Sequence, residues 1–142
     1  MIVQVNEKNE TLWAELCVSL WPTHTIEEML QERRDGLFSH EFIYYIDDEA
    51  VGFMSLSIRS DYVEGTDSSP VGYLEGIYVK PNYRKQGIAK ALVDYAKKWA
   101  KEQECTELAS DCELDNETSI LFHKQLGFQE QNRIVCFTMK CE

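Results

Sequence analysis

The chain has 142 residues and a mass of 16.5 kDa, which is enough for one domain around one hydrophobic core. Its formal net charge is −11 and its pI is about 4.7, which argues against binding nucleic acid through a general positive field. The charge is segregated along the chain. Residues 80–101 hold seven bases and one acid, a local charge of +6, so the rest carries −17. This arrangement suits a protein that holds an anion at one place and a cation at another.

The amino terminus has no basic start followed by an apolar run, and no stretch approaches the roughly 18 apolar residues of a membrane span. We therefore expect a cytoplasmic protein with no membrane partner. The five cysteines are an odd number and contain no C-x-x-C pair, which argues against a disulfide framework and against a metal site. We expect reduced thiols. No repeat or linker divides the chain, so residues 1–142 are expected to form a single domain.

The first half of the chain predicts a strand, two helices and two further strands. Residues 2–5 form the first strand, and Asn9 or Thr11 begins a helix that ends before Pro22. Its apolar stripe is expected to be Leu12, Leu16 and Leu20. The spacing of Thr25 and Glu28 is typical of a capping box, which predicts a second helix up to Gly36. Residues 42–46 and 50–59 read as antiparallel strands joined by a tight turn.

The second half begins with residues 61–70, a loop by composition. A strand over 71–79 follows, then a long amphipathic helix over 87–104, a strand over 106–109 and a helix over 117–126 closed by Gly127. A last strand is expected over 133–139. The predicted fold class is therefore α+β, with a mixed central sheet flanked by helices.

The turn between the strand at 71–79 and the long helix is the most informative segment. Its core is the run Arg84-Lys85-Gln86-Gly87-Ile88-Ala89-Lys90. The first N–H groups of a helix lack intrahelical partners, and the helix dipole is positive there, so such a turn can bind phosphate. The segment has neither the glycines of the nucleoside-triphosphate loop nor those of the dinucleotide motif. A solvated basic helix face is the alternative, and it describes Lys97, Lys98 and Lys101 well.

Two residues of the preceding strand are unusual for its centre. Glu75 lies between apolar neighbours, and a carboxylate there either faces solvent at an edge or lines a cleft. Gly76 marks either a bulge or close backbone approach, or else a packing accommodation. Asp111, after the fifth predicted strand, belongs to an acidic run from Glu102 to Glu117. Such runs are usually solvated faces, but an acidic cleft beside an anion-binding turn would attract a cationic ligand.

The R-x-x-G-x-A pattern at the helix start, after a strand ending G-I-Y-V-x-P, resembles motif A of the GNAT superfamily of N-acetyltransferases. Asn116 and the run F-H-K-Q-L-G-F128 resemble its second cofactor-contacting motif. Further segments resemble the single-domain aminoglycoside 6'-N-acetyltransferases. They are S-L-W-P-T-H24, R-S-D-Y-V-E-G-T-D-S-S-P70, Y-L-E-G-I-Y-V79, A-S-D111 and N-R-I-V-C-F137. The resemblance covers the whole chain and implies the GNAT-type acyl-CoA N-acyltransferase fold.

The resemblance implies that acetyl-CoA is the co-substrate and that an aminoglycoside is the acceptor. The residues it implies for cofactor binding are Ile77, Tyr78, Val79, Lys85, Gln86, Gly87, Ile88, Ala89, Lys90 and Asn116. Those it implies for substrate binding are Trp21, His24, Tyr62, Glu75, Asp111 and Asn132. By sequence alone, Trp21 would be expected in the core and His24 in a turn.

Acetyl transfer to an amine requires that the amine lose a proton, that an oxyanion be stabilised and that the departing thiolate gain a proton. A backbone N–H at Ile77 or Tyr78 is the expected oxyanion donor, and Glu75 or Asp111 the expected proton acceptor. Both carboxylates would also raise the amine's pKa, so binding is their larger expected contribution. Many superfamily members carry a tyrosine as general acid where this chain has His123, so that role stays unassigned.

Two alternatives to an aminoglycoside 6'-N-acetyltransferase stay open at this point. One is a related acetyltransferase that acts on a polyamine or another small amine. The other is a non-catalytic module that binds acyl-CoA and has no use for acidic residues in a cleft. The resemblance also suggests a homodimer. The apolar run from Ile134 to Phe137 is expected either to pair or exchange across a subunit interface or to form a core strand.

Overall fold

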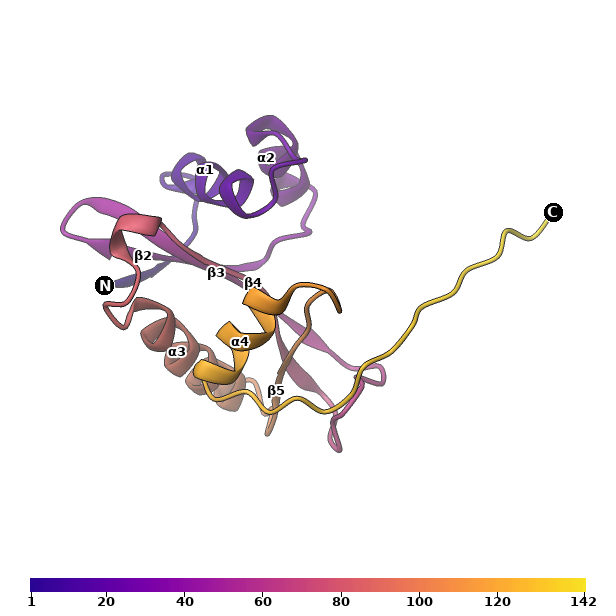
Figure 1. Ribbon diagram of the computed structural model, residues 1–142. Helices are drawn as coiled ribbons and strands as arrows, with labels where there is room; N and C mark the ends of the chain where they lie inside the picture. The colour runs from indigo at the N-terminus through magenta and orange to yellow at the C-terminus, as the bar shows by residue number, and fades with distance from the viewer.

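A computed structural model describes residues 1–142 and contains five strands and four α-helices (Figure 1). The elements run in the order β1 (Ile2–Gln4), α1 (Glu10–Leu20), α2 (Ile26–Arg34), β2 (His40–Ile46), β3 (Glu49–Arg59), β4 (Val71–Val79), the 3-10 turn η1 (Pro81–Tyr83), α3 (Ile88–Glu102), β5 (Leu108–Ser110) and α4 (Glu117–Gln125). The strands form one sheet in the order β1-β2-β3-β4-β5. Only β4 and β5 pair in parallel, so the predicted α+β class with a mixed sheet is confirmed.

Helices cover both faces of the sheet (Figure 1). α1 and α2 pack on one face over a core that includes Trp13, Met29 and Phe53. α3 packs on the other face, where Leu92 and Ala96 point at the strands as its apolar stripe predicted. The residues that end α4 and follow it pack against the α3 core. None of the helices is long and apolar enough to cross a membrane.

The helix starts show which capping predictions hold. Thr25 Oγ1 accepts a hydrogen bond of 3.1 Å from the N–H of Glu28, so the predicted cap of α2 is confirmed. Asn9 does stand at the N-cap of α1, but its side chain makes no cap bond. The predicted stripe of α1 is wrong at its first member, because Leu12 is exposed and the buried face begins at Trp13.

The predicted last strand over 133–139 is absent. Residues 126–142 belong to no helix or strand, and the end of the chain extends away from the rest of the molecule (Figure 1). Phe137 is 88% exposed and Met139 is 91% exposed. A strand is stable only when its backbone is paired and its apolar side chains are covered, and this segment finds neither within its own chain.

An irregularity in β4 determines where the functional side chains lie. Ser55 of β3 pairs with Gly76, and the next residue, Leu56, pairs with Leu74, so Glu75 is an extra residue in a β-bulge. β5 pairs with β4 only from Gly72 to Leu74. The part of β4 from the bulge to Val79 therefore has one edge without a partner strand. The exposed edge begins at the bulge, midway along β4.

Candidate functional site

The turn before α3 presents backbone N–H groups to solvent. Lys85 has φ = 63° and Gly87 has φ = 81°, so the turn contains two residues in the left-handed conformation, separated only by Gln86. Gly87 stands at the N-cap without a side-chain cap, and the first bond of the helix is from Ala91 N–H to Gly87 O. A Cβ on Gly87 would meet nothing within 4 Å, so there is open space in front of the turn. A concavity of this kind at a helix N-terminus can bind an anion.

The basic side chains of the turn divide into two groups. Arg84 is held by its own strand, because its Nε donates to the carbonyl of Val79 at 2.9 Å. Lys85 is exposed and makes no ion pair, and Lys90 contacts only Asp94, at 3.0 Å. Gln86 is exposed, whereas Ile88 is buried under the sheet and Ala89 is half-buried. Contact with an anion therefore falls to the turn's backbone and to Lys85 and Lys90.

The exposed edge of β4 leads into this turn. Ile77 and Tyr78 are half-buried, Val79 is buried against α3, and the chain then enters η1 and the basic turn. An extended ligand with amide groups can pair with such an edge as an added strand does. The edge and the turn are thus placed to hold a molecule that has amides at one end and phosphates at the other.

A cavity of about 320 Å³ lies between α1, α2 and the strands β3 and β4. Trp21, His24 and Glu75 line it together with Phe38 and Ser57. Trp21 packs on Phe38 and against Phe53, with ring centroids 6.4 Å and 5.8 Å apart, so its indole is a fixed wall. Nδ1 of His24 has no hydrogen-bond partner and lies 3.6 Å from Glu28. The structure therefore brings together three of the predicted substrate-binding residues.

Glu75 is held by an arginine that the sequence analysis did not single out. Arg59 Nη2 lies 2.8 Å from both carboxylate oxygens of Glu75, and its Nε lies 3.2 Å from Oε2. Ser57 Oγ donates to Oε2 at 2.5 Å. The guanidinium carbon of Arg59 lies 3.5 Å from the centre of the Tyr73 ring. The Glu75 carboxylate at the bulge is thus held by Arg59 and Ser57 instead of standing free in solvent.

Asp111 joins the same cluster through Tyr73. The Tyr73 hydroxyl donates a hydrogen bond to Oδ2 of Asp111, across the parallel pairing of β4 and β5. Burial raises the pKa of Tyr73 above its usual range, and the bond to Asp111 raises it further. Tyr73 therefore stays protonated and acts as a donor. Two carboxylates and one guanidinium together give this cluster, made of Arg59, Tyr73, Glu75 and Asp111, a charge of about −1.

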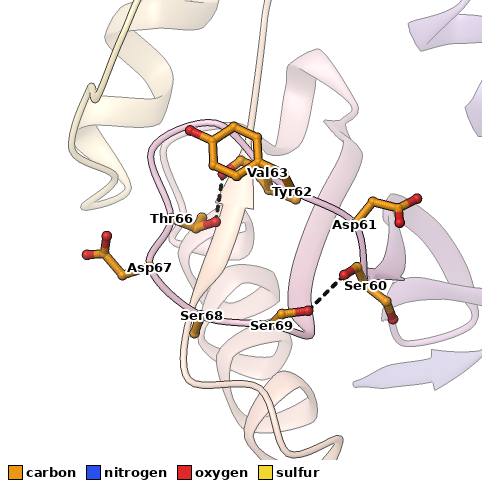
Figure 2. Close-up of a pocket in the computed structure, with 8 residues that line it drawn as sticks. All are labelled: Ser60, Asp61, Tyr62, Val63, Thr66, Asp67, Ser68 and Ser69. Atoms are coloured by element: carbon orange, nitrogen blue, oxygen red, sulfur yellow. Dashed lines mark hydrogen bonds between the residues drawn. The ribbon is translucent and has the colours of Figure 1, made fainter.

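Tyr62 and Asn132 lie in a different group from the cavity residues. Both side chains donate to Glu64, the tyrosine hydroxyl at 3.3 Å and the Asn132 amide at 2.6 Å. Figure 2 shows the loop that carries Tyr62, with the ring beside Val63 at one end of the loop and the hydrogen bond from Ser69 to Ser60 at the other. Asn132 belongs to the extended carboxyl-terminal segment. The structure therefore places these two predicted residues beside each other.

Asn116 and His123 both have structural partners. Asn116 caps α4, because its Oδ1 accepts from the N–H of Ser119 at 3.1 Å. Nε2 of His123 lies 2.8 Å from Ser110 Oγ, and Nδ1 lies 2.7 Å from the carbonyl oxygen of Ser119. Ser110 Oγ also lies 3.1 Å from the carbonyl oxygen of Leu74, so the hydroxyl contacts both β4 and the imidazole ring. His123 thereby ties α4 to β5.

A carboxylate that the sequence analysis did not single out, that of Glu41, is buried behind the cavity. Glu41 accepts from Trp13 Nε1 at 2.9 Å and from Ser55 Oγ at 2.7 Å. Burial raises the pKa of Glu41 to about 7, although these two hydrogen bonds lower it. Ser55 also lines the cavity, so one serine both contacts the buried acid and borders the cavity.

The residues missed around Glu75 had a signal in the sequence. Alternation along the two predicted strands places Arg59 and Ser57 of one, and Tyr73 and Glu75 of the other, on the same face of the sheet. Glu41 had a weaker signal, since it shares a strand face with Ile43. No group of three or more His, Cys, Asp or Glu side chains is arranged to hold a metal ion. All five cysteines are free.

Comparison with known proteins gives the class to which this fold and site belong. The model of the acetyltransferase (GNAT) family matches residues 6–128. The chain therefore belongs to the GNAT family of acetyltransferases and has the fold of that family.

Within that family the chain is similar to several aminoglycoside N(6')-acetyltransferases. It is 43% identical over 133 residues to the aminoglycoside N(6')-acetyltransferase type 1 of Acinetobacter haemolyticus, covering 92% of this chain and 91% of that protein. The crystal structure of an aminoglycoside 6'-N-acetyltransferase from the same organism superposes with a TM-score of 0.94 at 41% identity, covering 100% and 99%. A third relative was solved with a bisubstrate analogue of CoA and acetylneamine; its TM-score is 0.92 at 38% identity, covering 99% and 98%.

Proposed function

We propose that this protein transfers the acetyl group of acetyl-CoA to the 6'-amino group of aminoglycoside antibiotics, as an enzyme of antibiotic resistance. One observation carries the proposal. The bulge residue Glu75 lies immediately before the exposed edge of β4, so the acidic cluster and the edge that leads to the anion-binding turn meet on one strand. A cationic acceptor and an anionic donor would meet there.

The residues around the turn fit acetyl-CoA, which supplies the acetyl group as a thioester. The N–H groups of the first turn of α3 would bind the pyrophosphate, with Lys85 and Lys90 adding charge. Ile77, Tyr78 and Val79 would pair with the amides of the pantetheine arm. Asn116 caps α4 through its oxygen, which leaves its NH₂ group to reach the cofactor. A backbone N–H at Ile77 or Tyr78 would stabilise the oxyanion.

The acceptor would lie in the cavity beside Trp21 and His24, with its amines toward Glu75 and Asp111. An indole face packs well against a sugar ring, and the carboxylates attract ammonium groups. Tyr62 and Asn132 would contact the acceptor from the loop and the carboxyl-terminal segment, which Glu64 holds together. Glu75 and Asp111 would mainly bind and orient the polycation, because both already accept hydrogen bonds and both would raise the pKa of a nearby amine.

Thiol release from acetyl-CoA tests the proposal directly. The acceptors are a kanamycin-type aminoglycoside, a version without the 6'-amine, and spermidine. We expect turnover only with the intact aminoglycoside. Equal turnover without the 6'-amine would refute the site of transfer, and turnover with spermidine alone would favour an enzyme of polyamines or small amines. No turnover with any amine, together with CoA binding, would favour a non-catalytic acyl-CoA module.

We also propose that the protein is a cytoplasmic homodimer in which residues 1–142 act as one N-acetyltransferase domain. The exposed apolar side chains of Ile134, Val135, Phe137 and Met139 support the dimer, since nothing in their own chain covers them. A second copy can pair with this segment as a strand. Sedimentation at several concentrations tests this, and Phe137→Asp should shift the equilibrium to monomer while Glu142→Gln should not. Five free cysteines fit a reducing compartment.

A further inference from the structure

The predicted acceptor site already contains a cation. Glu75 is the carboxylate that adjoins the exposed edge of β4, and Arg59 makes three contacts of 2.8 to 3.2 Å with its two oxygens. Oε2 also accepts from Ser57, at 2.5 Å. A carboxylate offers about four lone-pair positions, so few remain for an incoming ammonium group.

Arg59 also covers the other groups that a substrate cation would use. Its guanidinium carbon lies 3.5 Å from the centre of the Tyr73 ring, where an ammonium group would gain a cation–π contact. The Tyr73 hydroxyl binds Asp111, so the same guanidinium faces the second carboxylate across the ring. One arginine thus neutralises about half the negative charge of the cluster.

Arg59 is placed so that its side chain can move away from Glu75. It is the last residue of β3, where the chain enters the loop at 60–70, and its side chain is 43% exposed. The Glu75 side chain is 32% exposed. A half-exposed ion pair contributes little net stability, because water solvates both groups when they separate. The guanidinium can therefore turn toward solvent without leaving a buried charge behind.

Resting on the proposed function, we propose that Arg59 is a resident competitor for the acceptor-amine site, and that substrates bind by displacing it from Glu75. An acceptor with several ammonium groups makes contacts elsewhere in the acidic cavity that offset the displacement. A monoamine has no such contacts and is excluded. Arg59 thereby raises the Kd of every acceptor that needs Glu75 by the same factor, so that only acceptors with several ammonium groups keep measurable affinity.

The matched variants are Arg59→Met, which keeps the stem over Tyr73 but removes the charge, and Arg59→Lys, which keeps the charge without the planar fork. Calorimetry measures the binding of neamine, spermidine and a monoamine to the CoA-loaded protein. For Arg59→Met we expect the Kd of the monoamine and that of neamine to fall by a similar factor, about tenfold, with CoA affinity within twofold of wild type. Arg59→Lys should change both in the same direction but less.

Glu75→Gln supplies the control for mechanism. Removing the carboxylate that Arg59 contacts should abolish the gain in amine affinity. Arg59→Met should therefore tighten amine binding when residue 75 is glutamate, but not when it is combined with Glu75→Gln. An equal gain in both would mean a general field effect and would overturn displacement. Weaker amine binding by Arg59→Met would also overturn it, because Arg59 would then hold Glu75 in its binding position.

Binding and turnover separate the two proposals. If wild-type protein fails to acetylate any aminoglycoside, the proposed function fails, while the calorimetric comparison still decides whether Arg59 competes with amines. If turnover occurs and Arg59→Met binds amines no better than wild type, the function stands and the competitor role is refuted. A melting temperature near that of wild type shows that each variant is folded.

Discussion

Gly76 on β4 lies directly against the indole ring of Trp21, and a Cβ at this position would come 2.6 Å from Cζ2 and 2.9 Å from Cη2 of that ring. The neighbouring Cδ2 of Leu20 would be 3.1 Å away. Both readings of Gly76 are confirmed, because the glycine packs against a side chain and also adjoins the bulge at Glu75. The glycine determines how deeply Trp21 sits at the wall of the cavity.

Gly76→Ala should therefore weaken acceptor binding. Phe38 and Phe53 pack against Trp21, so the indole can yield only toward the cavity. We expect a loss of about 1–3 kcal/mol in stability from overpacking and a raised KM for the aminoglycoside with an unchanged KM for acetyl-CoA. Steady-state kinetics and urea unfolding measure these effects. Gly72→Ala is the matched control: it would crowd Ala100 Cβ at 2.9 Å on the α3 side, which should cost stability without raising the acceptor's KM.

Glu41→Gln should change how stability depends on pH. The pKa of Glu41 is about 7 in the folded protein against an ordinary value of 4.5, so folding favours the protonated acid. Its stabilising contribution is complete below pH 4.5 and is lost as the pH rises toward and through 7, a change of about 3 kcal/mol. The variant should thus gain stability relative to wild type over this range. Urea unfolding from pH 4.5 to 8 measures it, and the exposed Glu15→Gln should show no such trend. A difference that is constant with pH would contradict the assignment.

Gly87→Ala should weaken acetyl-CoA binding more than acceptor binding. The residue has φ = 81°, so a Cβ strains the backbone by roughly 1 kcal/mol, and the added methyl group points into the open space before the turn. We expect the KM for acetyl-CoA to rise about tenfold, equivalent to about 1.4 kcal/mol. Gly127→Ala controls for strain, because Gly127 has φ = 100° and equally open surroundings at the end of α4. Equal effects of both variants on acetyl-CoA would contradict an anion site at the turn.

His123→Ala should affect stability rather than proton transfer. Both ring nitrogens have protein partners, Ser110 on β5 and Ser119 on α4, so the ring joins the two elements. We expect a loss of about 1–3 kcal/mol in stability and no change in the shape of the pH profile of kcat. Lys124→Ala, on the exposed side of α4, is the control and should leave both unchanged. If kcat of the His123 variant lost a pH limb, the histidine would be a proton donor after all.

The sequence alone determined those features that depend on residues close together in the chain. The cap at Thr25, the apolar stripe of α3 and the glycine-containing turn before it follow from local spacing, because helix geometry repeats every 3.6 residues and orphan N–H groups lie at every helix start. The motifs around Gly87 and Gly127 also carried the family, which the comparison with known proteins established. The one element that local pattern predicted wrongly, the strand over 133–139, needs a partner that its own chain does not supply.

Only the tertiary structure decided how the charges are partnered. The register of β3 against β4 slips by one residue at Glu75, and no local propensity fixes such a bulge. That slip and the long loop between the two strands bring Arg59 onto Glu75, and the short parallel pairing of β5 brings Asp111 onto Tyr73. Burial depends on what packs above a residue, which is why Glu41, unremarkable in the sequence, has the most perturbed carboxyl group in the fold. Sequence specified which charges are present, and tertiary packing determined which of them a ligand can reach.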